Sequence, residues 1–154
     1  MKKIVLFDID YTLFDTDVFK KSELKKHSIY NEVEEVLKKV SEIADLGIFS
    51  QGVLDFQNNK LKKTDIRKYF KEGYIHIVEE KEPNLLEVLS KYKNHELFLV
   101  DDKLTVLYKA KMLMPSVFTV WIKRGIYAEC QKPIKNFVPD AIITNLMELL
   151  SIIV

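Results

Sequence analysis

Short apolar runs alternate along this chain with longer stretches in which apolar residues recur every three or four positions. The apolar runs are 4–7, 47–49, 74–78, 97–100, 117–121 and 141–143. Several of them are continuous, without the polar alternation that is typical of a sheet with one wet face. They predict strands that are covered on both faces.

Helical periodicity separates these runs. In segment 31–47 the apolar positions follow a 3.6-residue repeat, and Gly47 is the expected stop. Segment 82–92 carries Pro83 in a first-turn position, and segments 103–113 and 144–153 follow, the last with Thr144 or Asn145 as its N-cap. Alternation of strand and helix predicts an α/β fold, a doubly wound parallel sheet with right-handed crossovers and helices on both faces. No linker or repeat divides the chain, so we expect one domain over residues 1–154.

Composition narrows the class of protein. Hydrophobic residues make up 47% and charged residues 31% of the chain, which excludes a disordered protein. A net charge of +1 gives no reason to expect nucleic acid or a membrane surface as a partner. The single cysteine, Cys130, excludes a disulfide framework and fits a reducing compartment. The apolar runs at the two ends are too short for a signal-peptide core or a membrane span, so we expect a soluble cytoplasmic protein.

Polar residues follow four of the predicted strands. The first strand ends in Asp8 and Asp10, the second in Ser50, the third is followed by Lys81, and the fourth runs into Asp101 and Asp102. Ligand sites in parallel sheets lie at the carboxyl ends of the strands, so these side chains are expected to converge.

Such a set has a definite chemistry. Several converging carboxylates need a cation, and oxygen ligands without histidine or cysteine favour Mg²⁺. A hydroxyl and an ammonium across the same cleft suit a phosphoryl group. One carboxylate can then attack phosphorus, and a second, two residues on, can act as general acid and then as general base.

The segments that carry these residues resemble the motifs of the haloacid dehalogenase (HAD) superfamily of phosphohydrolases. "FDIDYTLFDT" is similar to the first motif, "IFSQG" to the second, "EEKEPNLLEVL" to the third and "FLVDDKLTVLYKAKML" to the fourth, and the likeness covers about residues 3–150. The resemblance implies that Asp8 is the nucleophile and Asp10 the acid/base, whose backbone carbonyl also reaches Mg²⁺. By the same resemblance Ser50 and Lys81 bind the phosphoryl group. Asp102 is then the direct metal ligand, with Asp101 as its helper.

The chain departs from the family pattern in three places. Tyr11 stands where the family most often has Gly, and Gln51 replaces a common Asn. No second acid follows four residues after Asp102, so Asp101 must complete the fourth motif. The segments between the motifs are also short, which leaves room for no more than a minimal helical cap at about 17–46. Selectivity would then come from that cap, from a neighbouring subunit, or from a large substrate that covers the site.

Other polar features have simpler explanations. Asp15 is expected to be structural, and the basic stretch 60–71 is read as an amphipathic helix with a solvated face, in preference to a polyanion site. The histidines 27, 76 and 95 are taken as surface or packing residues and Trp121 as core.

The expected function is Mg²⁺-dependent hydrolysis of a phosphate monoester through a phosphoaspartate. The substrate is expected to be a small-molecule ester, with a phosphoprotein also possible, and the chain a monomer or homo-oligomer. Two alternatives stay open, a receiver-like phosphoacceptor module and a non-catalytic relative that binds a protein partner. The position of Asp8 and Asp10 after the first strand weighs against the receiver-like module. The presence of both aspartates weighs against the non-catalytic relative.

Overall fold

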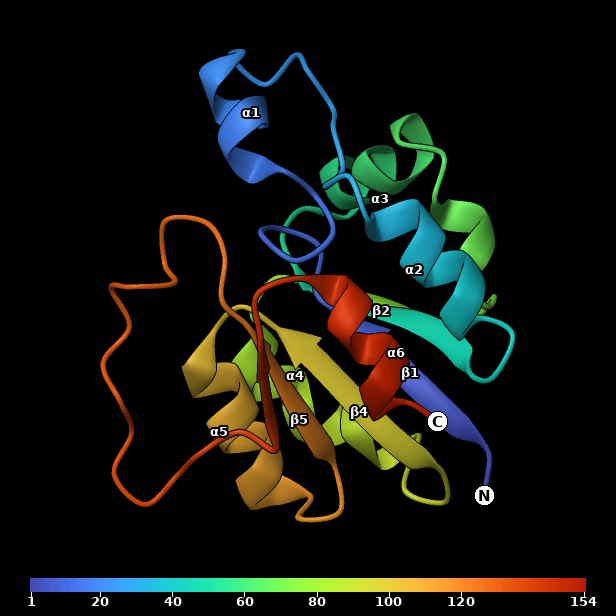
Figure 1. The fold of residues 1–154 in the computed structure, drawn as a ribbon, viewed down its shortest axis with the longest axis vertical. Coiled ribbons are helices and arrows are strands. Elements are labelled where there is room, and N and C mark those ends of the chain that lie inside the picture. The colour runs from blue at the N-terminus through green and yellow to red at the C-terminus, as the bar shows by residue number, and fades with distance from the viewer.

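The computed structural model describes residues 1–154, and its centre is a six-stranded parallel sheet (Figure 1). The strands are β1 (Lys3–Phe7), β2 (Asp45–Gln51), β3 (Ile75–Val78), β4 (Glu96–Asp101), β5 (Phe118–Ile122) and β6 (Ala141–Ile143). Their order in the sheet is β3-β2-β1-β4-β5-β6, so the chain runs outward from β1 and then returns to its other side. This reversal between β1 and β4 is where parallel sheets place their ligand crevice.

Six α-helices connect or flank the strands. They are α1 (Thr16–Lys21), α2 (Val33–Val40), α3 (Leu54–Lys63), α4 (Lys81–Ser90), α5 (Leu104–Leu113) and α6 (Leu149–Ile152), with 3₁₀ turns at Arg67–Tyr69 and Leu146–Glu148. Asn145 caps the last of these turns through a capping box with Glu148, one of the two caps that the sequence predicts. None of the helices has the length and hydropathy needed to cross a bilayer.

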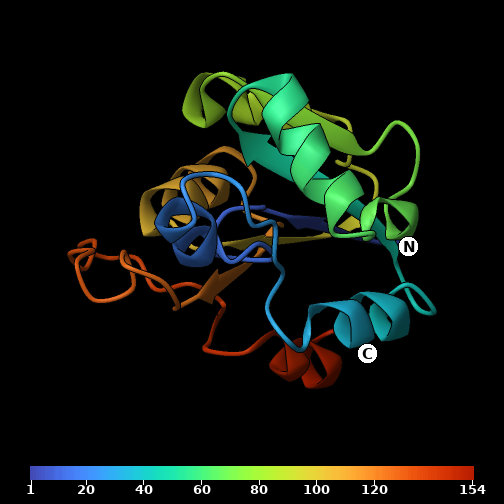
Figure 2. The same cartoon turned by 90° about the horizontal axis from the view of Figure 1, so that it is seen from above.

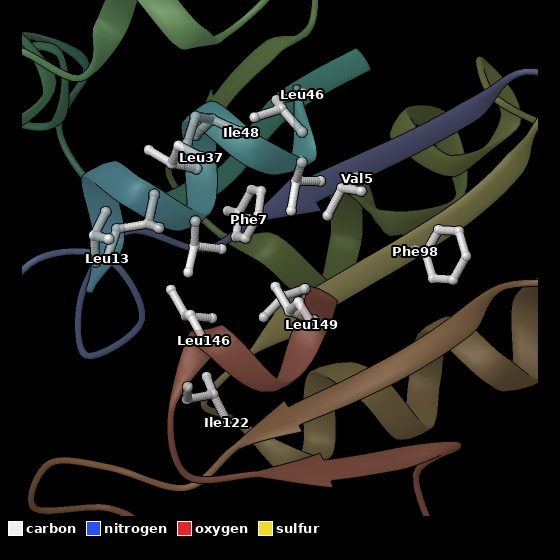
Figure 3. Close-up of a cluster of buried hydrophobic side chains, with 14 of the residues drawn as sticks. Val5, Phe7, Leu13, Leu37, Leu46, Ile48, Phe98, Ile122, Leu146 and Leu149 are labelled. Atoms are coloured by element: carbon white, nitrogen blue, oxygen red, sulfur yellow. The ribbon is translucent and has the colours of Figure 1, made fainter. Parts of the chain in front are cut away.

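The helices form two layers over the sheet. Helices α2 and α6 lie over one face, and α4 and α5 lie over the other (Figures 1 and 2). Buried side chains accordingly form two clusters, and the larger one contains β1 residues Val5 and Phe7 together with Leu37 of α2 and Leu149 of α6 (Figure 3). The predicted α/β class and doubly wound parallel sheet are confirmed, and each predicted strand lies within two residues of its observed bounds.

Two helix predictions are wrong in their bounds. The helix predicted at 31–47 ends at Val40, and Gly47 lies inside β2. A Cβ there would come 2.5 Å from the Tyr74 carbonyl oxygen, so this glycine serves close strand packing and is no helix stop. The single helix predicted at 60–71 is also absent, because α3 ends at Lys63 and Asp65 has a φ of +58°.

The region predicted as a minimal cap divides into two parts. Helix α2 packs on the sheet through buried residues and belongs to the main body of the fold. Only α1 and the loop that follows it stand above the carboxyl ends of the strands (Figure 1). A second long loop, residues 123–140, projects from the side between β5 and β6 (Figures 1 and 2).

Candidate active site

A cavity of about 330 Å³ lies at the reversal point of the sheet, at the ends of β1 and β4. Five of the six side chains that the sequence predicts for the site line it, namely Asp8, Asp10, Lys81, Asp101 and Asp102. The sixth, Ser50, is fully buried beside them and does not line the cavity. Segments more than ninety residues apart in the sequence therefore meet at one edge of the sheet, as the strand-end pattern predicts.

Lys81 is the central cation of this cluster. Its Nζ atom lies 3.0 Å from Asp8 Oδ1 and 2.6 Å from Asp101 Oδ2, and all three side chains are buried. Burial alone would lower the pKa of the Lys81 ammonium, but the adjacent Asp101 and Asp8 carboxylates outweigh it and hold that pKa above its usual value. Lys81 is the first residue of α4, and its backbone N–H donates to Gln51 Oε1 at 3.0 Å.

Three carboxylates surround the remaining space. Oxygen atoms of Asp8, Asp101 and Asp102 lie within 4.8 Å of one another, and all three residues are buried. Asp102 Oδ2 has no hydrogen-bond partner although it is buried. Burial and the two neighbouring carboxylates raise the pKa of Asp102, and burial together with Asp101 raises the pKa of Asp8.

This donor set fits a hard divalent cation. It offers oxygen ligands only, it carries more negative charge than Lys81 can neutralise, and one oxygen is left without any donor. The Asp10 carboxylate is not part of the cluster, so the side-chain ligands that the structure offers are those of Asp8, Asp101 and Asp102.

Asp10 instead accepts hydrogen bonds from three side chains. Lys60 Nζ lies 2.8 Å and Thr16 Oγ1 3.0 Å from its Oδ1 atom, and Gln57 Nε2 lies 3.0 Å from its Oδ2 atom. Gln57 also donates to Ser50 Oγ at 2.8 Å, so one side chain of α3 links the ends of β1 and β2.

Lys60, Gln57 and Thr16 are the site residues that the sequence analysis missed. Lys60 was expected on a solvated helix face, but its side chain is only 11% exposed and its ammonium lies over the Phe14 and Phe19 rings. The available signal was the three-residue spacing of Gln57 and Lys60, which places both on one face of a helix. This spacing indicates a shared helix face only when the start of α3 at Leu54 is known, and the sequence does not mark that start clearly.

Neighbouring residues fix the loop after β1. Tyr11 has a φ of +61°, which explains why Gly is common at this position, and its hydroxyl donates to Asp17. Its ring packs against Gly125, where a Cβ would come 2.2 Å from a ring carbon. Arg124 donates to the Thr12 carbonyl and pairs with Glu32 of the segment before α2. The loop thus keeps its conformation without the usual glycine.

Hydrogen bonds also fix the backbone at Asp102, after β4, and the start of α1. The indole of Trp121 donates to the Asp102 carbonyl at 3.0 Å, and Gln131 Nε2 donates to the same oxygen at 2.7 Å. Trp121 is buried, as predicted. Asp15 accepts from the Val18 N–H as the N-cap of α1, which agrees with its predicted structural role.

No protein-family model matches the chain, and no curated protein matches it in sequence. Solved structures do. A haloacid dehalogenase-like hydrolase from Burkholderia xenovorans superposes with a TM-score of 0.79 at 19% identity, over 97% of this chain and 95% of that one. The HAD-type hydrolase YfnB of Bacillus subtilis, solved with bound magnesium, gives 0.74 at 13% identity, over 99% and 98% of the two chains. A Clostridium difficile protein named as a phosphatase gives 0.75 at 18% identity, over 99% of both chains.

The chain has the haloacid dehalogenase (HAD) fold. These identities establish the fold and leave the chemistry to be argued from the residues of this chain. The HAD fold here is small: the sheet has six strands, and α1, its following loop, α3 and the loop 123–140 all contribute residues to the site.

Proposed function

We propose that this HAD-fold protein is a Mg²⁺-dependent phosphatase that hydrolyses phosphate monoesters through a phosphoaspartate. The observation that supports this most is the buried cluster of Asp8, Asp101 and Asp102 around Lys81, with Asp102 Oδ2 lacking any partner. Helix capping does not account for the whole cluster: Asp101 Oδ1 accepts from the Lys103 N–H at 2.9 Å, but its Oδ2 atom faces Lys81, and Asp8 and Asp102 are buried without bonds to backbone N–H groups.

Asp8 is the proposed nucleophile because of its position. It is the first residue after the central strand β1, and its Oδ1 atom faces Lys81 at 3.0 Å. A carboxylate oxygen of Asp8 attacks phosphorus, the bond from phosphorus to the ester oxygen breaks, and the phosphoryl group is transferred to Asp8. Lys81 neutralises charge on Asp8 and on the transferred group along this path.

Asp10 is the proposed acid/base. In the first step it gives a proton to the departing ester oxygen, and in the second it takes a proton from the water that attacks the phosphoaspartate. The products are the free alcohol, inorganic phosphate and the original Asp8 carboxylate. Lys60, Thr16 and Gln57 hold the Asp10 side chain in place. Ser50 is the proposed hydroxyl ligand of the phosphoryl oxygens; it is buried beside the cavity, behind Gln57, which must move for Ser50 to reach them.

Magnesium is the proposed cofactor. Asp8, Asp101 and Asp102 would hold it, with the Asp10 backbone carbonyl as a further ligand, and it would supply positive charge against the phosphoryl oxygens. The proposed substrate is a small-molecule ester, with no nucleic acid or membrane surface as a partner. We further propose the cytoplasm as its compartment, which the single, exposed Cys130 supports.

Hydrolysis of phenyl phosphate tests this function. We expect turnover by the wild-type protein with Mg²⁺ and none with a chelator. Asp8→Asn should lose at least about 10³-fold in kcat, and Asp10→Asn about 10²-fold or more. Asp15→Asn is the matched control, because asparagine caps a helix as aspartate does, and it should stay within about twofold of the wild type.

Two outcomes would contradict the proposal. Metal-independent turnover, or full activity in Asp8→Asn, would overturn the mechanism. Accumulation of a stable phosphoprotein without release of phosphate would favour the receiver-like alternative.

A further inference from the structure

A second hollow of about 230 Å³ adjoins the catalytic cavity, between the segment after α1 and the outer face of α3. The two cavities share three lining residues, Phe19, Leu24 and Lys60. The two cavities therefore meet at these three side chains, within reach of a molecule whose phosphoryl group sits against Asp8. No residue of the second hollow apart from Lys60 and Gln57 has a part in the proposed mechanism.

The polar side chains between the two cavities are already paired. The Lys60 ammonium is bonded to Asp10, and the Gln57 amide nitrogen is bonded to Asp10 and Ser50. Both N–H donors of the Gln57 amide are therefore occupied, and the ammonium of Lys60 is held at Asp10, so a sugar-like group placed there would gain few hydrogen bonds for those that it loses to water.

The rest of the hollow offers mainly apolar surface. Leu24 is 58%, Val53 61% and Phe56 63% exposed, and they line the hollow from the loop after α1 and from the start of α3. Three polar residues, His27, Asn59 and Lys63, also line it. Large apolar side chains gathered at the mouth of a cavity are a common mark of a ligand site. Here these side chains adjoin the catalytic cavity, which would bind the charged phosphoryl group of a substrate.

We propose that the substrate is a phosphate monoester with an apolar, aryl or alkyl, leaving group that occupies this second hollow. The inference rests on the proposed function and names its substrate class. The phosphoryl group binds among Asp8, Lys81 and the metal, and the apolar body extends past Lys60 to contact Leu24, Val53 and Phe56.

A series of para-alkylphenyl phosphates tests this inference, because lengthening the alkyl chain from methyl to butyl barely changes the acidity of the phenol. Burial of one methylene group can raise affinity by up to about fourfold. For a partly open hollow we expect kcat/KM to rise by about twofold per methylene, and by roughly tenfold from methyl to butyl.

Substitutions of exposed residues in the second hollow test whether the alkyl chain binds there, because they do not disturb the core of the protein. Leu24→Ser and Phe56→Ser should each reduce the butyl-to-methyl ratio of kcat/KM to below about threefold. Leu54→Ser is the matched control. Leu54 is also 58% exposed and adjoins Val53 in the sequence, but it lines neither cavity, so this variant should keep the wild-type ratio.

The outcomes separate this inference from the function on which it rests. Absence of turnover with every ester, phenyl phosphate included, would overturn both. Turnover with a flat chain-length profile would overturn the apolar site alone, and so would an equal loss of the ratio in Leu54→Ser. If Phe56→Ser changed the molar mass seen by light scattering while the profile stayed flat, the surface would be a contact between copies of this chain.

Discussion

At the scale of single residues, the site depends on an ion pair that joins Asp10 to α3. Lys60 Nζ lies 2.8 Å from Asp10 Oδ1, and the Lys60 side chain is largely buried against Phe14 and Phe19. A buried lysine is rare unless it is paired, and here its partner is the proposed acid/base. Lys60 is therefore a positioning residue, which acts on the reaction through Asp10.

Replacement of Lys60 by methionine tests this role. Methionine keeps most of the apolar stem over the two rings and removes only the ammonium, so Asp10 loses one of its three side-chain donors. We expect kcat/KM for phenyl phosphate to fall roughly tenfold to a hundredfold, within the range that general acid–base catalysis contributes. Steady-state kinetics at saturating Mg²⁺ would measure the change.

Lys62→Met serves as the control for that experiment. Lys62 is exposed on the same helix and lines neither cavity, so the variant should retain wild-type kinetics. Wild-type activity in Lys60→Met, or an equal loss in both variants, would show that the ion pair does not position Asp10.

Tyr11 illustrates the limit of motif comparison at the same scale. The sequence shows that glycine is missing from the loop after β1. It does not show what replaces the conformational freedom of glycine. The structure supplies the compensation at a distance of more than a hundred residues, because the Tyr11 ring packs on Gly125 and Arg124 donates to the Thr12 carbonyl. Such long-range compensation has no local signature in a single sequence.

At the scale of elements, apolar runs predicted the strands well and periodicity predicted the helices less well. Each strand is a continuous apolar run because helices cover both faces of the sheet, so the signal is strong. Helix α3 gives a weak signal, since Leu54 and Phe56 point to solvent while Gln57 and Lys60 are buried. Its pattern is inverted because its inner face serves the active site, and this is why Lys60 was assigned to a solvated face.

A histidine whose charge depends on pH lies between β3 and the segment that follows α4. His76 of β3 is buried, and its Nε2 atom lies 2.5 Å from the Tyr92 hydroxyl. Burial, reinforced by the positive charge of Lys91, lowers the pKa of His76 from 6.5 to about 4. The folded protein therefore keeps this ring neutral at pH values where the unfolded chain protonates it.

His76 makes the protein lose stability as the solution becomes more acidic. Above pH 6.5 both states have a neutral His76, and as the pH falls from 6.5 towards 4 only the unfolded state gains the proton, so the free energy of unfolding decreases. The raised pKa values of Asp8 and Asp102 act in the opposite direction, and they do so equally in the wild type and in a His76 variant. Between pH 7 and pH 5 we therefore expect the Tm of the wild type to change unfavourably by a few degrees relative to the Tm of the variant, measured by circular dichroism. His76→Gln removes this contribution, whereas His27→Gln, which changes a half-exposed histidine, should keep the wild-type dependence of Tm on pH. An unchanged slope in His76→Gln would contradict the assignment.

At the scale of the whole molecule, the fold places excess negative charge where the two halves of the sheet meet. The order β3-β2-β1-β4-β5-β6 makes β1 and β4 neighbours, so Asp8 from one motif meets Asp101 and Asp102 from another. The order of motifs in the sequence could predict this meeting. The sequence could not show that Asp102 would be left without a donor or that Asp10 would turn towards α3, because both depend on side-chain positions.

This arrangement makes opposite predictions for one variant with and without metal. Burial and neighbouring carboxylates raise the pKa of Asp102, so its charge opposes folding when no cation is bound. Asp102→Asn should therefore raise Tm by a few degrees in a chelator.

With metal the expected effect has the opposite sign. Wild-type protein at a Mg²⁺ concentration about 100-fold above Kd should gain about 2.7 kcal/mol in the free energy of unfolding, or roughly 5–10 °C in Tm. The Asp102→Asn variant should lose most of that gain. The control variant Asp55→Asn removes the same charge from an exposed position of α3. Its Tm should differ from that of the wild type by no more than about 1 °C, both in the chelator and with Mg²⁺. Scanning calorimetry of the three proteins in both conditions would decide the matter, and an equal Mg²⁺ gain in wild type and Asp102→Asn would show that Asp102 does not hold the metal.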